Sequence, residues 1–129
     1  MKINLFVWGI VGSLSVLGCQ KNDKEQLDKD AKLMATLECE ARQLKEERFK
    51  AANEMRFMED SLAKYKKTLT AIQSQQMDSV KNVYTLRTGA LADKITKTMD
   101  SLFATSYQTA EQRQAFDVAT EKMLQEVCK

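Results

Sequence analysis

A heptad repeat of apolar residues constrains the fold of this chain more than any other feature. With Leu27 as position a, twelve of the fourteen a and d positions through Ile72 are apolar or aromatic. These positions form the heptad seam, which comprises Leu27, Met34, Leu37, Ala41, Leu44, Ala51, Met55, Met58, Leu62, Tyr65, Leu69 and Ile72. Such a repeat is typical of a long helix that packs lengthwise against another helix. A helix over 27–72 would be roughly 69 Å long.

The composition agrees with long helices and removes several classes of function. The chain contains no proline and no histidine, and only Gly89 among its four glycines lies beyond residue 18. The 20 basic and 18 acidic side chains nearly cancel, so there is no electrostatic case for a nucleic acid partner. Without histidine, a catalytic base or a zinc site is not expected. We therefore expect no catalytic residues, no metal and no bound cofactor.

Two positions are candidates for the turn after the first helix. The heptad seam falters at Gln76 and Ser79, and the apolar positions that follow are one residue out of phase. This pattern predicts a turn at 74–79, with Asp78 or Ser79 as the N-cap of the next helix. One alternative is a turn at Gly89, directly after a helix that ends at Thr88, and the other is a helix that runs through both positions. A later helix start is clearer, because Thr109-Ala110-Glu111-Gln112 has the sequence of a capping box.

The first 18 residues have the pattern of a secretory signal peptide. Lys2 precedes an uncharged stretch that is too short to span a bilayer. Val16-Leu17-Gly18-Cys19, followed at once by polar residues, resembles the lipobox of bacterial lipoproteins, although Leu17 stands where a small residue is more usual. The resemblance implies cleavage between Gly18 and Cys19. It also implies diacylglycerol and an N-acyl chain such as palmitate on Cys19, which would anchor the protein to a membrane.

These patterns predict a signal peptide at 1–18, a polar tether at 19–26 and a helical domain at 27–129. The tether, Gln20-Lys21-Asn22-Asp23-Lys24-Glu25, also resembles the export signal of surface lipoproteins in some Gram-negative lineages, with a plain solvated linker as the alternative. The resemblance implies a location in the cell envelope, at the outer membrane, and leaves the periplasmic or surface face open.

The assignment of Cys19 to lipid leaves Cys39 and Cys128 as a pair. In an exported protein, two remaining thiols tend to form a disulfide, with two free thiols or intermolecular bridges as the alternatives. In an antiparallel hairpin, this pair would place the turn near residue 83 or 84. We therefore predict a long coiled-coil-like helical hairpin whose descending arm is two helices. The alternative is a compact three-helix bundle with the first helix broken near 51–53.

Short motifs are also similar to those of a family of small uncharacterised bacterial lipoproteins. They are Asp30-Ala31-Lys32, Cys39-Glu40-Ala41, the segment 107–112 and a cysteine close to the C-terminus. The chain departs from that family in its long middle, 49–103, and in Lys129 after the last cysteine. The resemblance implies no activity.

The sequence therefore predicts a membrane-anchored, non-catalytic helical lipoprotein that acts as an interaction or structural module of the cell envelope. Its partner would be another protein or a second copy of the chain. The alternative is a client- or ligand-binding protein similar to periplasmic chaperones with long helical arms.

Overall fold

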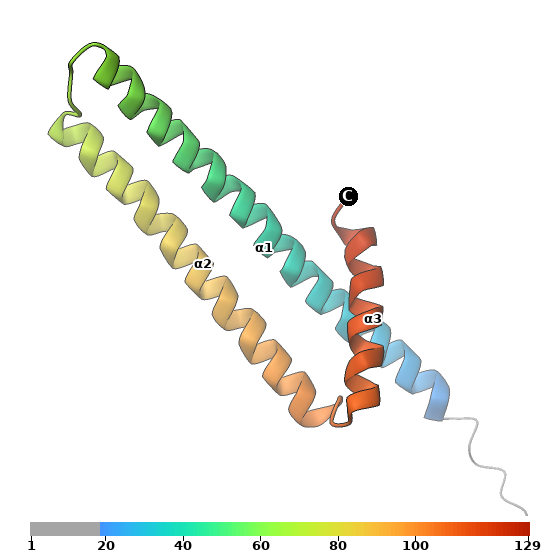
Figure 1. Cartoon of the computed structure of the whole chain (residues 1–129). Helices are drawn as coiled ribbons and strands as arrows, with labels where there is room; N and C mark the ends of the chain where they lie inside the picture. Colours follow the sequence, from blue (N-terminus) through green and yellow to red (C-terminus); the bar gives the residue numbers. More distant parts are fainter. Residues whose placement is uncertain (1–18) are drawn as a thin grey trace, which may run out of the picture.

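The computed structural model describes residues 19–129, which form three α-helices and no strand. Helix α1 spans Cys19–Lys64, α2 spans Ala71–Thr105 and α3 spans Ala110–Val127. Helices α1 and α2 run antiparallel as a long hairpin, and α3 packs against α1 near its N-terminal end (Figure 1). The prediction of an all-α fold is confirmed.

Helix α1 is continuous over 46 residues. It passes through 51–53, where the alternative of a compact bundle required a break, and that break is absent. Its backbone is already helical over 19–26, the segment predicted to be a tether. The two alanines at 51 and 52 favour helix, and the segment contains no proline or glycine that would interrupt it.

The turn of the hairpin lies at residues 65–70, so both predicted turn positions are wrong. Residues 74–79 and Gly89 lie within α2. Helix α1 instead ends in a Schellman motif, in which the Lys67 amide donates to the Leu62 carbonyl and the Lys66 amide to that of Ala63, each at 3.0 Å. Lys66 has a φ of 53°, a conformation that more often indicates glycine. The sequence therefore has no glycine at this position that would have predicted the helix end.

Capping boxes begin both later helices. Thr70 accepts a hydrogen bond from the Gln73 amide and starts α2, and Thr109 does the same with Gln112 at α3. In both cases the glutamine side chain reaches back to the amide of the threonine, so two backbone donors are satisfied. The capping box predicted at Thr109 is confirmed.

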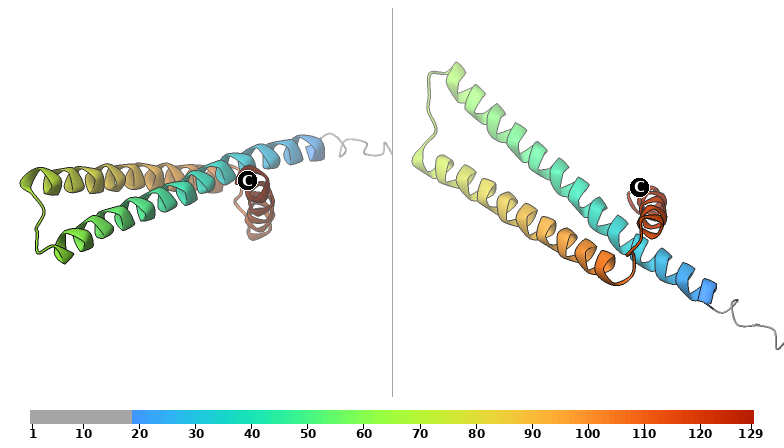
Figure 2. Two further views of the ribbon diagram at one scale, coloured as in Figure 1. Left: turned by 90° about the horizontal axis from the view of Figure 1, so that it is seen from above. Right: turned by 60° about the horizontal axis from the view of Figure 1, so that its bottom comes forward.

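Helix α3 does not continue the line of α2 down the hairpin. It turns back and crosses α1, as the views in Figure 2 show. Tyr107, before α3, contacts Asp30, whereas Cys128, after α3, is bonded to Cys39, so α3 advances in the same direction as α1. The estimate of a turn near residue 83 or 84 failed because it assumed that α3 runs antiparallel to α1.

Both buried clusters of the hydrophobic core lie in the region where α3 packs on α1. One buried cluster is formed by Met34, Leu37, Tyr107 and Phe116, and a second by Ala35, Cys39 and Leu124. Helix α2 contributes only partly buried side chains to the first cluster, among them Leu91, Ile95, Met99 and Leu102. Every member of these clusters lies within 27–128, so the chain from Cys19 onward contains the whole described core.

Aromatic packing fixes the corner between α2 and α3. The Tyr107 ring stacks on Phe116 with 4.6 Å between ring centroids, and Phe103 meets Phe116 edge-on at 6.0 Å. The Arg113 guanidinium lies 4.9 Å from the centre of the Phe103 ring, and its Nε donates to the Tyr107 carbonyl at 2.9 Å. These contacts close the corner and set the direction in which α3 leaves it.

Candidate functional site

The hairpin divides into two parts that differ in how well their side chains are covered. We call residues 27–44 and 91–128 the base, and residues 45–64 and 71–90 the distal arms. Of the residues whose burial is described, 23–129, all the buried ones lie in the base except Met77, which is 6% exposed in α2. The distal arms and the loop 65–70 that joins them carry seven of the nine large apolar side chains that are exposed in the described chain, and they are the candidate site.

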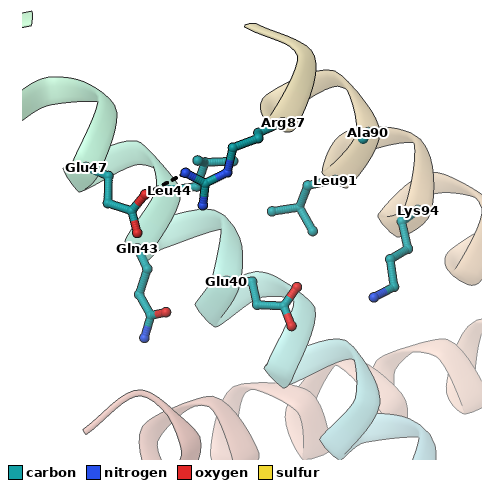
Figure 3. Close-up of a pocket in the computed structure, with 8 residues that line it drawn as sticks. All are labelled: Glu40, Gln43, Leu44, Glu47, Arg87, Ala90, Leu91 and Lys94. Atoms are coloured by element: carbon teal, nitrogen blue, oxygen red, sulfur yellow. Dashed lines mark hydrogen bonds and ion pairs between the residues drawn. The ribbon is translucent and has the colours of Figure 1, made fainter. Parts of the chain in front are cut away.

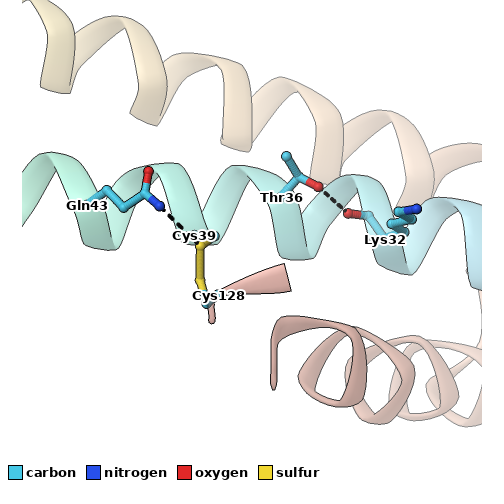
Figure 4. Close-up of a disulfide and its surroundings, with 5 residues drawn as sticks. All are labelled: Lys32, Thr36, Cys39, Gln43 and Cys128. Carbon is cyan, nitrogen blue, oxygen red and sulfur yellow. Dashed lines mark hydrogen bonds between the residues drawn. A yellow bond between two sulfur atoms is a disulfide. The ribbon is translucent and has the colours of Figure 1, made fainter. Parts of the chain in front are cut away.

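A disulfide locks the base. Cys39 in α1 and Cys128 at the end of α3 are bonded, with 5.5 Å between their Cα atoms (Figure 4). Cys39 is 4% exposed, and the Gln43 Nε2 atom lies 3.8 Å from its sulfur. The predicted pairing of Cys39 and Cys128 is confirmed.

A buried polar pair holds the start of α3 on α1. The Tyr107 hydroxyl donates to Asp30 Oδ2 at 2.9 Å, and the Gln26 side chain donates to Asp30 Oδ1 at 2.9 Å. Burial, and then the hydrogen bond to Asp30, raise the pKa of the Tyr107 hydroxyl. Sequence reasoning missed this pair. Asp30 occupies a d position of the heptad repeat and is the one acidic residue among the fourteen a and d positions.

Large apolar side chains are exposed on the distal arms. Phe57 is 75% exposed and Leu86 74%, values that leave most of each side chain in contact with water. The exposed set on the distal arms is Phe49, Phe57, Ile72, Val80, Val83 and Leu86. The seam residues of this part of α1, Ala51, Met55, Met58 and Leu62, are only half-buried. An exposed apolar surface of this kind is typical of an interaction site.

An open groove of about 410 Å³ lies between the two helices where the distal arms leave the base (Figure 3). Its lining comes from both helices and consists of Glu40, Gln43, Leu44, Glu47, Arg87, Ala90, Leu91 and Lys94. Arg87 Nη1 donates to Glu47 Oε2 at 2.9 Å and bridges the groove. Both side chains are about half exposed, so this ion pair aligns the helices more than it stabilises them.

A second groove shares Leu44 and Leu91 with the first and has a different character. Its volume is about 370 Å³, and its floor is completed by the apolar residues Ala41, Ala92 and Ile95 together with Thr88. Lys45 and Arg48 border it. Arg48 occupies an a position of the heptad repeat and is the one basic residue among the fourteen a and d positions.

The predicted signal cleavage and lipid attachment stay predictions. Gly18 lies outside the described residues, and Cys19 is described only as the first residue of α1. Within 19–129, no group of three potential ligands is placed to hold a metal ion. None of the described helices has the length and apolar character needed to cross a membrane.

Comparison of the chain with protein-family models, with curated proteins and with solved structures found no match.

Proposed function

We propose that this protein is a non-catalytic, lipid-anchored module of the bacterial cell envelope that presents its distal arms to a protein partner. The anchor in this proposal is supported by Val16-Leu17-Gly18-Cys19 and the uncharged stretch before it. Lipid on Cys19 would tether the end of α1 that carries the base. The distal arms would then extend away from the membrane.

The observation that carries the proposal is the contrast between the base and the distal arms. The base holds both buried clusters and is covalently closed by the Cys39–Cys128 disulfide, although Leu33 and Val118 are exposed on it. The distal arms leave Phe57 and Leu86 about three-quarters exposed. Leaving a large side chain in water forgoes roughly 1.5–3 kcal/mol of burial, so covering several of them would stabilise a complex.

Site-specific crosslinking in cells tests the partner. A photoreactive residue at Phe57 or Leu86 should capture a specific protein, because these side chains project from the distal arms. The matched control carries the photoreactive residue in place of Gln125, which is exposed on α3. Equal capture from all three positions would contradict the assignment of the site to the distal arms.

Metabolic labelling tests the anchor separately. Cells grown with labelled palmitate should incorporate the label into the wild-type protein but not into C19S. The variant C39S/C128S controls for cysteine loss and should keep the label, because both residues belong to the disulfide. Label in C19S would show that the lipid is not on Cys19.

A second candidate function is the binding of an apolar client or ligand, and the groove bordered by Lys45 and Arg48 favours it. Its apolar floor and two cations suit an amphiphile with an acidic head group. Native mass spectrometry of protein purified from cells would reveal such a ligand as an added mass. Loss of that mass in K45Q/R48Q, and its retention in K29Q/K32Q, would support this function over the first.

A further inference from the structure

The tip of the hairpin combines positive charge with exposed apolar side chains. The segment 61–77 contains Lys64, Lys66 and Lys67 and no acidic residue. All three lysines are exposed. Tyr65 between them is 76% exposed, and Ile72 at the start of α2 is 69% exposed. We call these five residues the cationic tip.

Helix capping accounts for only part of this charge. A lysine in the last turn of α1 interacts favourably with the helix dipole, and Lys64 is placed to do so. Lys66 and Lys67 lie beyond the last residue of the helix, and neither forms an ion pair within the described chain. Asp60, one turn before Lys64, forms no ion pair with it within the described chain. The charge at the cationic tip is therefore available to an external partner.

Local hydrogen bonds hold the cationic tip in a defined shape. The amides of Lys66 and Lys67 are bonded to carbonyls in the last turn of α1. On the other side of the loop, the Thr70 capping box fixes the first turn of α2, which carries Ile72. A surface that binds here would not have to order the backbone of the loop, which lowers the entropic cost of binding.

We propose that the cationic tip docks on an anionic membrane surface. Lysine ammonium groups beside the phosphates of lipid head groups gain electrostatic attraction, and a tyrosine beside them suits the membrane–water interface. Isoleucine adds apolar contact. The cationic tip contains no arginine, the residue that pairs with a carboxylate through two parallel hydrogen bonds, so a lipid surface fits it better than an acidic protein does.

The cationic tip lies at the opposite end of α1 from Cys19, and a helix of 46 residues is roughly 69 Å long. This inference rests on the proposed function, in which lipid on Cys19 anchors the start of α1 to a membrane. With both attachments, the molecule would connect two membrane surfaces separated by about that length. The docking of the tip itself does not require the lipid, so it can be tested alone.

Vesicle binding tests the proposal with residues 19–129 carrying C19S, which hold the whole described core and no lipid site. The protein should co-sediment with vesicles of phosphatidylcholine plus phosphatidylglycerol and not with phosphatidylcholine alone. Each lysine near an anionic surface strengthens binding about fivefold, so K64Q/K66Q/K67Q should bind about 100-fold more weakly. Raising the salt concentration should weaken wild-type binding, because exposed charges are screened.

A matched triple variant separates local from overall charge. K24Q/K32Q/K122Q removes three exposed lysines from the rest of the molecule and should bind as the wild type does. Y65S/I72S should keep the dependence on anionic lipid and bind more weakly. Circular dichroism of each variant checks that it is folded.

Equal weakening by the two lysine variants would overturn the proposal, and so would the absence of a preference of the wild type for anionic vesicles. If the wild type ignores both kinds of vesicle but palmitate labelling of Cys19 succeeds, the membrane docking fails and the proposed anchored module stands. Capture of an acidic protein by a crosslinker at Tyr65, without vesicle binding, would likewise exclude a membrane as the partner of the tip.

Discussion

Removal of the Cys39–Cys128 disulfide should destabilise the protein by an amount that follows from its position in the chain. The two residues are 89 apart in sequence, so the bond closes a ring that contains most of the helical domain. In the chain-entropy model, cross-linking a loop of this length lowers the entropy of the unfolded chain and contributes about 4–5 kcal/mol. Single domains are commonly stable by only about 5–15 kcal/mol, so the loss would be large.

The variant C39A/C128A in a C19S background tests this reasoning, with C19S alone as the control. Urea unfolding followed by circular dichroism should give a free energy of unfolding about 4–5 kcal/mol lower for the variant. The slope of that free energy with urea should increase, because an unfolded chain without the cross-link exposes more surface. Reduction of the control with dithiothreitol should reproduce the effect, and the variant should not respond.

The loss of stability in the variant should arise in the unfolded chain and not in the folded state. The core contacts of Leu124 and Ala35 should survive in the variant, because alanine fits wherever the cysteine Cβ did. A loss below about 1 kcal/mol would refute the loop-entropy account. So would a loss of helix content before any urea is added, because the effect would then lie in the folded state.

Three further substitutions test single features of the fold by the same urea assay. Y107F should cost about 1–3 kcal/mol, since it leaves the buried Asp30 carboxylate without its tyrosine donor. Burial and the Asp30 hydrogen bond raise the pKa of Tyr107, so the folded state keeps a proton that the unfolded state loses above about pH 10. Wild-type stability should therefore fall as the pH rises past that value, and the cost of Y107F should shrink; a cost independent of pH would contradict this. T120V should stabilise by about 1 kcal/mol, since the buried Thr120 hydroxyl has no hydrogen-bond partner within the described chain, and a destabilised variant would point to an unseen partner. G89A should stabilise by about 0.5–1 kcal/mol, because Gly89 lies inside α2 with open space where a Cβ would be; an unchanged midpoint would count against this.

Much of the fold could be predicted from local patterns. The heptad seam indicated the long helix, the Thr109 capping box marked the start of α3, and the cysteine count gave the disulfide. The same capping rule also applied to Thr70 and Gln73, where it would have placed the turn correctly. The heptad seam conflicts with this rule, because Leu69 and Ile72 continue the apolar spacing past the end of α1 although Ile72 is exposed at the start of α2.

The direction of α3 could not be predicted from the same patterns. An apolar face on a short helix fits α1 equally well in either direction, and a single disulfide does not distinguish them. The direction of α3 is set by the aromatic corner and by the hydrogen bond from Tyr107 to Asp30, and the latter joins residues 77 apart in sequence. Such tertiary contacts leave little trace in one sequence. The candidate site was foreseen only as a seam in need of a partner, because the seam itself does not show which side chains stay exposed.

The disulfide also determines what a protease can do to the exposed loop 65–70. Residues 39–128 form a covalently closed ring, and this loop lies inside it. A single cut in the loop would open the ring without releasing either piece, because Cys39 would still hold the α2–α3 fragment on α1. The nicked protein would therefore run as one species on a non-reducing gel and as two after reduction. A force applied between the tip and Cys19 would likewise be shared beyond Cys39 by two covalent strands, one through α1 and one through α3 and α2.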